Sequence, residues 1–168
     1  MRNRVGVAAV IALVALVVGA VSPALGSSSG GSTTASIEDS DAQTIRATFV
    51  VTDFAQVDNG AQGTTLGDEV VLSGPLLRNG NPVGRADVIC TFVLATAARE
   101  EAQCPGTAEL PGGQITVSGV IVNQSLNFTL PITGGSGQFQ EAEGQLVSRD
   151  VSPSPQQPML RFTFQLVG

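Results

Sequence analysis

The chain has 168 residues, enough for one domain and little more. It contains no histidine, tyrosine or tryptophan, its basic residues are all arginine, and its formal net charge is −6. Without histidine or lysine, a Ser-His-Asp triad, a Cys-His pair and a lysine Schiff base are all excluded. Two cysteines and carboxylates make a poor zinc ligand set, so we expect no metal. The acidic balance, with arginines scattered along the sequence, disfavours nucleic acid as a partner.

The first 41 residues have the composition of an export signal followed by a linker. A basic start over 1–4 precedes an uncharged apolar run over 5–21, and Ala24 and Gly26 offer small residues for cleavage. We therefore expect a signal peptide over 1–26 and a secreted protein, the alternative being a single N-terminal membrane anchor. Residues 27–41 are rich in Ser, Gly and Thr and end with acidic residues, which predicts a disordered linker. Residues 42–168 then form the domain.

This domain reads as short strands separated by turn residues. In 44–53 apolar and polar side chains alternate, with Ile45, Ala47, Phe49 and Val51 on one face. Eight strands are predicted in all: 44–53, 66–77, 83–96, 102–110, 114–122, 126–132, 137–149 and 158–167. Gly74-Pro75 interrupts the second strand and predicts a bulge or a barrel corner. No segment predicts a helix, so the domain is all-β, either a sandwich or a closed barrel.

A glycine-rich stretch near the end of the chain is its most distinctive feature. Gly134, Gly135 and Gly137 occupy three of four positions after Thr133, and Phe139 follows. Such a stretch predicts a hairpin turn in which positive φ is needed more than once. A phosphate-binding loop would need a lysine or a dinucleotide-binding spacing, and this stretch has neither.

The pattern TGGSGxFxxAxGQ, which begins at Thr133, resembles the signature of the allene oxide cyclase barrel family and, more distantly, that of dirigent proteins. Four further segments match in order: LGD over 66–68, GRADVIC over 84–90, GQITVSG over 113–119 and LRFTFQL over 160–166. The resemblance covers 44–168 and implies an eight-stranded antiparallel β-barrel. A barrel of that size is either filled by side chains or holds one small ligand.

Cys90 and Cys104 are the two cysteines of the chain. In an exported protein such a pair suggests a disulfide. If 83–96 and 102–110 form a hairpin, the two cysteines lie nearly opposite each other. The resemblance offers another use, because plant members of the family carry a cavity-lining cysteine where Cys90 stands. Since one sulfur atom cannot serve both purposes, these readings exclude each other, and we expect the disulfide.

Few side chains are candidates for chemistry in the lumen. The catalytic candidates are Asp53, Asp68 and Cys90, and an inward carboxylate in an apolar cavity would have a raised pKa. The side chains expected to meet a ligand are Phe49, Leu72, Phe128, Phe162 and Phe164. The first-strand glutamate of the plant family falls near Asp53. The second-strand asparagine falls on Gly74, and the cavity tyrosine has no counterpart.

Two functions follow from the resemblance. Related bacterial cyclases form spirotetronate and similar rings, a reaction driven largely by holding two ends of one molecule together. We therefore expect an exported barrel that binds a flexible apolar small molecule and directs its cyclisation or isomerisation without a cofactor. The alternative is non-catalytic binding of an apolar ligand or dirigent-like steering, since the fold serves both equally well. Plant relatives associate as trimers, but no strand of this sequence marks an interface, so the oligomeric state stays open.

Overall fold

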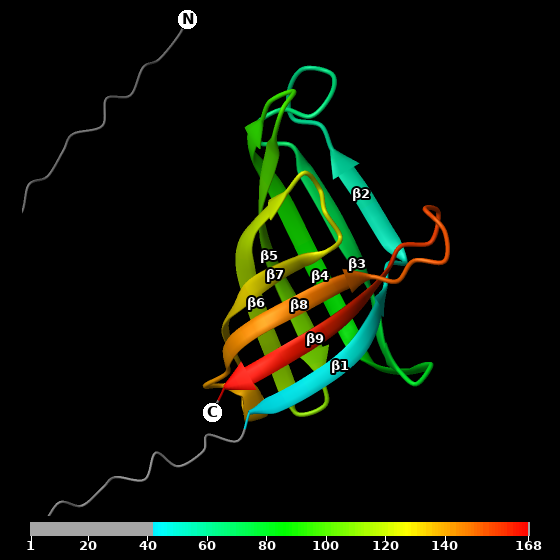
Figure 1. The fold of residues 1–168 in the computed structure, drawn as a ribbon, viewed down its shortest axis with the longest axis vertical. Helices are drawn as coiled ribbons and strands as arrows, with labels where there is room; N and C mark the ends of the chain where they lie inside the picture. Colours follow the sequence, from blue (N-terminus) through cyan, green and yellow to red (C-terminus); the bar gives the residue numbers. More distant parts are fainter. Residues whose placement is uncertain (1–41, 168) are drawn as a thin grey trace, which may run out of the picture. The chain divides into compact units, whose positions relative to one another are not determined.

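The computed structural model describes residues 42–167 (Figure 1). The predicted signal peptide over 1–26 and linker over 27–41 lie outside the described residues. Nine strands and one short 3-10 turn follow in chain order: β1 (Gln43–Val50), β2 (Asp53–Val57), β3 (Glu69–Arg78), β4 (Asn81–Ala95), β5 (Glu100–Leu110), β6 (Gly113–Val122), β7 (Phe128–Gly135), η1 (Gly137–Phe139), β8 (Glu143–Asp150) and β9 (Met159–Val167). Within this part of the chain, no helix has the length and hydropathy needed to cross a membrane.

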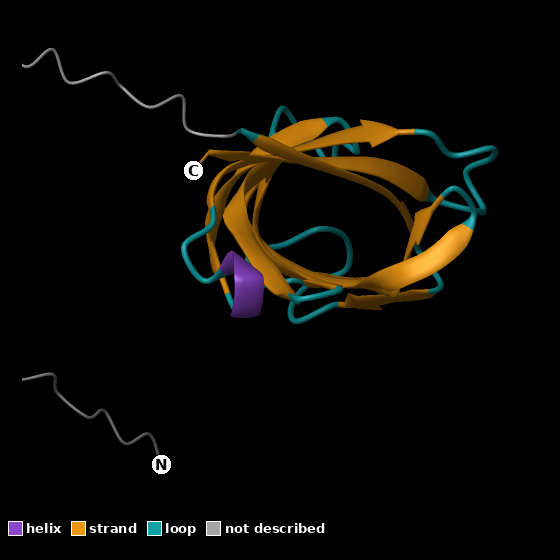
Figure 2. Ribbon diagram, turned by 90° about the horizontal axis from the view of Figure 1, so that it is seen from below, coloured by secondary structure: helices purple, strands orange, loops and turns teal. Residues whose placement is uncertain are grey.

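Eight of the strands close into an antiparallel barrel, as predicted. Neighbouring strands pair in the order β1-β9-β8-β7-β6-β5-β4-β3, and β1 pairs with β3 to complete the ring. Figure 2 shows this ring of strands end on. β2 is an extra strand that pairs with the first half of β3, from Val57 opposite Glu69 to Asp53 opposite Ser73. β1 and β2 therefore lie one after the other along β3 (Figure 1).

The chain turns a corner where β1 ends and β2 begins. Gly74 on β3 lies against this corner, and a Cβ atom there would collide with the backbone oxygen of Val50. The backbone N–H of Thr52 donates to the oxygen of Ser73 at 3.0 Å, just before the β2 pairing starts. The strand predicted over 44–53 is thus two strands. The corner predicted at Gly74 is confirmed, because β3 changes its partner there.

Inward-facing side chains fill one end of the barrel. The alternation predicted for the first strand is confirmed, since Ile45, Ala47 and Phe49 are buried. Other strands and η1 contribute the remaining members of this core, which are Leu76, Ala86, Ala108, Leu110, Ile115, Val117, Leu130, Ile132, Phe139 (from η1), Leu146, Leu160, Phe162, Phe164 and Leu166. Burial of apolar surface, worth roughly 25 cal/mol per Å², is the main stabilising force for such a core.

The glycine-rich turn closes this end of the barrel. It contains η1, so the strand predicted over 137–149 begins only at Glu143. This three-residue 3-10 turn is the one helical element among the described residues, and the domain is all-β as expected. The turn packs on the β5–β6 connection, where Gln138 N donates to the oxygen of Gly112 at 2.9 Å. Gly137 has a φ of +62°, and a Cβ atom on it would collide with the same oxygen. Backbone therefore touches backbone at this point, which explains the need for glycine.

Candidate functional site

An apolar pocket of about 200 Å³ lies at the other end of the barrel, away from the glycine-rich turn. Strands from both sides of the ring and the β6–β7 connection contribute to it. Its lining consists of Phe49, Val51, Phe54, Val70, Leu72, Val88, Cys90, Phe92, Ala102, Cys104, Ile121, Gln124, Ser125, Leu126, Phe128, Pro158, Leu160 and Phe162. The lumen is thus packed at one end and hollow at the other.

Phenylalanine rings form one wall of the pocket. Phe49 and Phe162 stack with ring centroids 5.2 Å apart and planes inclined by 27°. Behind them, the Phe164 ring meets that of Phe162 edge-on at 6.2 Å. Phe54 on β2 stands at the pocket mouth and is 65% exposed, which makes it one of the most exposed large apolar side chains of the described part. The pocket can therefore offer flat apolar contacts both inside and at its entrance.

Four of the five predicted lumen residues border this pocket: Phe49, Leu72, Phe128 and Phe162. Phe164 does not, because it lies in the packed end of the barrel. Sequence reasoning missed Phe54, since the strand was expected to end at residue 53, and it missed Gln124, which falls in a predicted turn. The sequence carried no signal for Phe54, because continued alternation past Val51 would have put Asp53 on the inner face; the corner between β1 and β2 brings Phe54 to the pocket instead.

Polar side chains enter the lining only from the β6–β7 connection, among the described residues. Gln124 donates from Nε2 to Glu100 Oε2 at 2.8 Å, and the Ser125 hydroxyl donates to the backbone oxygen of Asn127 at 3.0 Å. No Asp, Glu or Arg side chain of the described residues borders the pocket. The described lining residues therefore offer a bound molecule apolar contacts, one amide and one hydroxyl group.

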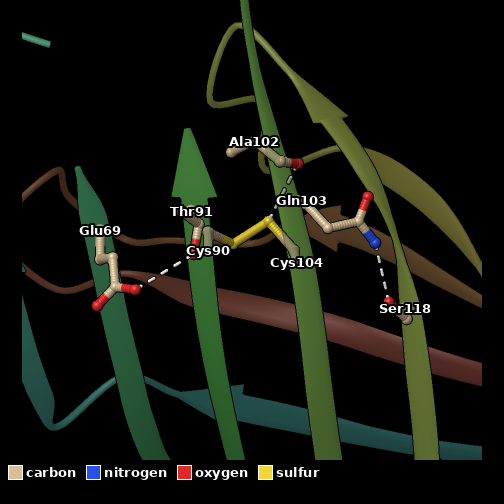
Figure 3. The surroundings of a disulfide bond; sticks show 7 residues. All are labelled: Glu69, Cys90, Thr91, Ala102, Gln103, Cys104 and Ser118. Carbon is tan, nitrogen blue, oxygen red and sulfur yellow. Dashed lines mark hydrogen bonds between the residues drawn. A yellow bond between two sulfur atoms is a disulfide. The ribbon is translucent and has the colours of Figure 1, made fainter. Parts of the chain in front are cut away.

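The predicted disulfide between Cys90 and Cys104 is present in the pocket wall (Figure 3). β4 and β5 form the expected hairpin, with Thr91 opposite Gln103, and this register sets the two cysteines against each other. The Cα atoms are 4.1 Å apart. Cys90 is bonded, so the use of its free thiol as a catalyst is contradicted by the structure. A disulfide is compatible with an extracellular location.

Asp68 is buried, but its side chain does not border the pocket and instead forms hydrogen bonds with the loop between β2 and β3. Its carboxylate accepts hydrogen bonds from the backbone N–H groups of Asn59 at 2.8 Å and Thr65 at 2.7 Å, and from the Thr65 hydroxyl at 3.1 Å. These donors, Asn59 first and Thr65 next, hold the pKa of Asp68 below its ordinary value. A raised pKa was expected only for a carboxylate inside an apolar cavity, and Asp68 has a different environment, in which backbone donors favour the ionised form more than burial opposes it.

Asp53 lies on the outer face of the barrel. Its carboxylate is 3.7 Å from the guanidinium group of Arg85, and it accepts a hydrogen bond from the Thr52 hydroxyl at 2.9 Å. Arg85 also pairs with Asp87 at 3.1 Å, the surface ion pair that sits two residues apart on β4. Asp53 therefore does not place a carboxylate in the lumen, because its side chain is exposed and does not border the pocket.

A family comparison matches residues 44–159 to the allene oxide cyclase barrel like domain. A search of curated proteins finds no match. Among solved structures, a pyocyanin demethylase aligns with 26% identity over 74% of this chain and 100% of its own, with a TM-score of 0.65. The pterocarpan synthase dirigent protein PsPTS1 aligns with 16% identity over 77% of this chain and 97% of its own, with a TM-score of 0.61.

A third solved structure with this fold is the Diels-Alderase AbmU from Streptomyces koyangensis. It aligns with 14% identity over 73% of this chain and 63% of its own, with a TM-score of 0.59. The similar structures thus include cyclases and dirigent proteins, the same two groups that the sequence resembled. At such identities, the likenesses to the dirigent protein and to AbmU show a shared fold.

Proposed function

Because the chain belongs to the allene oxide cyclase barrel like family, we propose that its barrel binds a small apolar molecule and directs that molecule's ring closure or isomerisation. The observation that carries this proposal is the pocket itself, lined by apolar side chains and by no acid or base of the described residues. In such a site the protein acts by shape, holding reacting atoms in contact so that the entropy of bringing them together is already spent. We further propose that the protein works after export, with the disulfide formed.

The size of the pocket limits what can be enclosed. An engineered protein cavity of about 150 Å³ binds benzene, so a pocket of about 200 Å³ takes a body of one ring or a short folded chain. A larger molecule would extend through the mouth, where the exposed Phe54 ring offers a further apolar contact. The proposed substrate is therefore apolar at the buried end and solvated at the other.

The likeness to pyocyanin demethylase favours a second candidate, a planar aromatic substrate of the pyocyanin kind. The stacked pair Phe49 and Phe162 gives the pocket a flat wall, and aromatic rings gain about 0.5–1.5 kcal/mol from such contacts beyond area burial. This candidate shares the binding site with the first and differs in the reaction.

A matched pair of variants tests binding in the pocket. Val70→Phe places a ring in the lining, whereas Val71→Phe places the same ring on the next residue of β3, which lies outside the pocket lining. With the wild type, pyocyanin or a linear triene able to close on itself should raise the melting temperature. Val71→Phe should keep that shift and Val70→Phe should lose it. Equal shifts in all three proteins would refute binding in the pocket.

Product analysis separates catalysis from passive binding. The triene is incubated with the wild type, with Val70→Phe and with buffer, and the rate and stereochemistry of ring closure are measured. A faster closure with one dominant stereoisomer, seen only with the wild type, supports the cyclase proposal. Thermal stabilisation without any change in products supports the non-catalytic carrier instead. Loss of the methyl group from pyocyanin would favour the second candidate.

A further inference from the structure

Four arginines gather on one wall of the barrel. Arg46, Arg78 and Arg161 border a polar hollow of about 440 Å³ on the outside of β1 and β9, beside the end of β3. Arg149 on β8 stands directly opposite Arg161 on β9. The expectation that the arginines are scattered is therefore wrong in space, because the fold brings the first strand and the last two strands together.

These arginines lack carboxylate partners among the described residues. The ion pairs in this part of the chain join Arg85 to Asp53 and Asp87 and Arg99 to Glu101. None of them involves a residue of β1, β3, β8 or β9. Of the four gathered guanidinium groups, that of Arg149 donates to the backbone oxygen of Ser148 at 2.8 Å. Those of Arg46, Arg78 and Arg161 make no hydrogen bond to another described residue, so no residue within 42–167 uses their guanidinium donors.

The grouping of these arginines lowers the stability of the fold, which suggests that it has a purpose other than stability. Like charges directly opposite each other on antiparallel strands destabilise a sheet, and Arg149 and Arg161 are such a pair. Arg46 lies on the neighbouring strand, diagonal to Arg161, because Arg161 is opposite Thr48. No acidic side chain borders the hollow among the described residues; its polar neighbours are Gln43, Thr44, Thr48 and Asn79. A bound anion would relieve the repulsion that the fold builds in.

We propose that this hollow binds a small phosphate-type oxyanion. The guanidinium fork matches phosphate oxygens in a bidentate manner, and its charge is permanent. The ligand is small or presents a single headgroup, because acidic residues outnumber arginines over the chain as a whole and would repel a long polyanion. The same chemistry is offered by a free phosphate and by the phosphate of a lipid headgroup.

One competitor lies in the chain itself. Glu38, Asp39 and Asp41 precede β1 in the sequence, and β1 begins at Gln43, which borders the hollow. If these acidic residues occupied the hollow, an external anion would bind only after they were neutralised. The experiment therefore includes a variant in which they become Gln, Asn and Asn.

The test uses the full chain and two probes. Inorganic pyrophosphate is titrated calorimetrically at low ionic strength, and vesicles of phosphatidylglycerol are compared with vesicles of phosphatidylcholine by sedimentation. The wild type is compared with the triple variant Arg46→Gln, Arg78→Gln, Arg161→Gln. Arg85→Gln serves as the control, because Arg85 is an exposed arginine that already has a carboxylate partner.

The proposal expects pyrophosphate or phosphatidylglycerol binding to weaken at least tenfold in the triple variant and to stay within twofold in the control. Pyrophosphate binding indicates a free anion, and binding to phosphatidylglycerol alone indicates a headgroup. Without any anion, Arg149→Gln should raise the melting temperature, since it relieves the repulsion from Arg161. No binding of either probe, equal loss in the control, or binding that emerges only when Glu38, Asp39 and Asp41 are neutralised would overturn the proposal.

Discussion

Cys90 on β4 and Cys104 on β5 join two adjacent strands through a bond that forms part of the pocket wall. The inward packing around this bond is thin, with Phe92, Ala102 and Cys104 forming a small buried cluster of their own. The pairing of β4 with β5 also becomes irregular just beyond it, between Phe92 and Leu94. The disulfide therefore supports the hollow end of the barrel, where fewer side chains hold the strands together.

Removing this bond should lower the free energy of unfolding by about 3 kcal/mol, the value expected for a closed loop of this length. The cysteines are separated by 14 positions in sequence. Guanidinium denaturation with and without a reductant measures the effect. The double variant Cys90→Ala, Cys104→Ala is the control, because its stability should equal that of the reduced wild type and should not change when the reductant is added. A wild type equally stable in both conditions would contradict the assignment.

Gly137→Ala should destabilise the protein far more than Gly80→Ala. Both glycines have positive φ, +62° and +79°, so the backbone strain of about 1 kcal/mol is shared. At Gly80 a Cβ atom would meet open space, whereas at Gly137 it would collide with the backbone oxygen of Gly112. Overpacking of this kind adds roughly 2 kcal/mol. Chemical denaturation of the two variants measures the difference. Equal losses in the free energy of unfolding would show that the glycine-rich turn does not contact the β5–β6 connection at Gly112.

Asp68→Asn should reduce the dependence of stability on acid pH. The pKa of Asp68 is lowered from the ordinary value of 3.8, chiefly by the N–H of Asn59 and then by that of Thr65. The stabilisation is therefore fully present above the unfolded-state pKa, and it is lost as the pH falls from that value through the folded-state pKa. The variant should be less stable than the wild type at neutral pH, and the gap should close as the pH falls below 3.8.

Denaturation at a series of pH values between neutrality and acid measures that gap. Asp150 also has a lowered pKa, caused by hydrogen bonds from Ser152, and contributes to the same acid window. Because Asp150 is present in both proteins, the difference between wild type and variant isolates Asp68. A gap that stayed constant across the series would mean that the loop does not depend on the ionised carboxylate.

The strands and the disulfide were predictable from local patterns, whereas the choice of a closed barrel over a sandwich came from the resemblance to a known family. Alternating side chains mark each strand, and the hairpin joining β4 to β5 fixes which residues face each other. The direction of the Asp68 pKa shift could not be predicted from the sequence, because it depends on backbone N–H groups supplied by the loop before β3. The gathered arginines could not be predicted, because Arg46, Arg149 and Arg161 meet only through the pairing of β1 with β9 and of β9 with β8.

The most direct test of the account is a crystal structure of the protein under xenon pressure. Xenon enters dry apolar cavities in proteins and is located by its anomalous scattering. The account predicts xenon in the hollow end of the barrel, in contact with the stacked rings of Phe49 and Phe162. A lumen with no xenon, or one in which side chains fill the space between these rings and Ala102, would contradict the proposal that the barrel receives an apolar molecule.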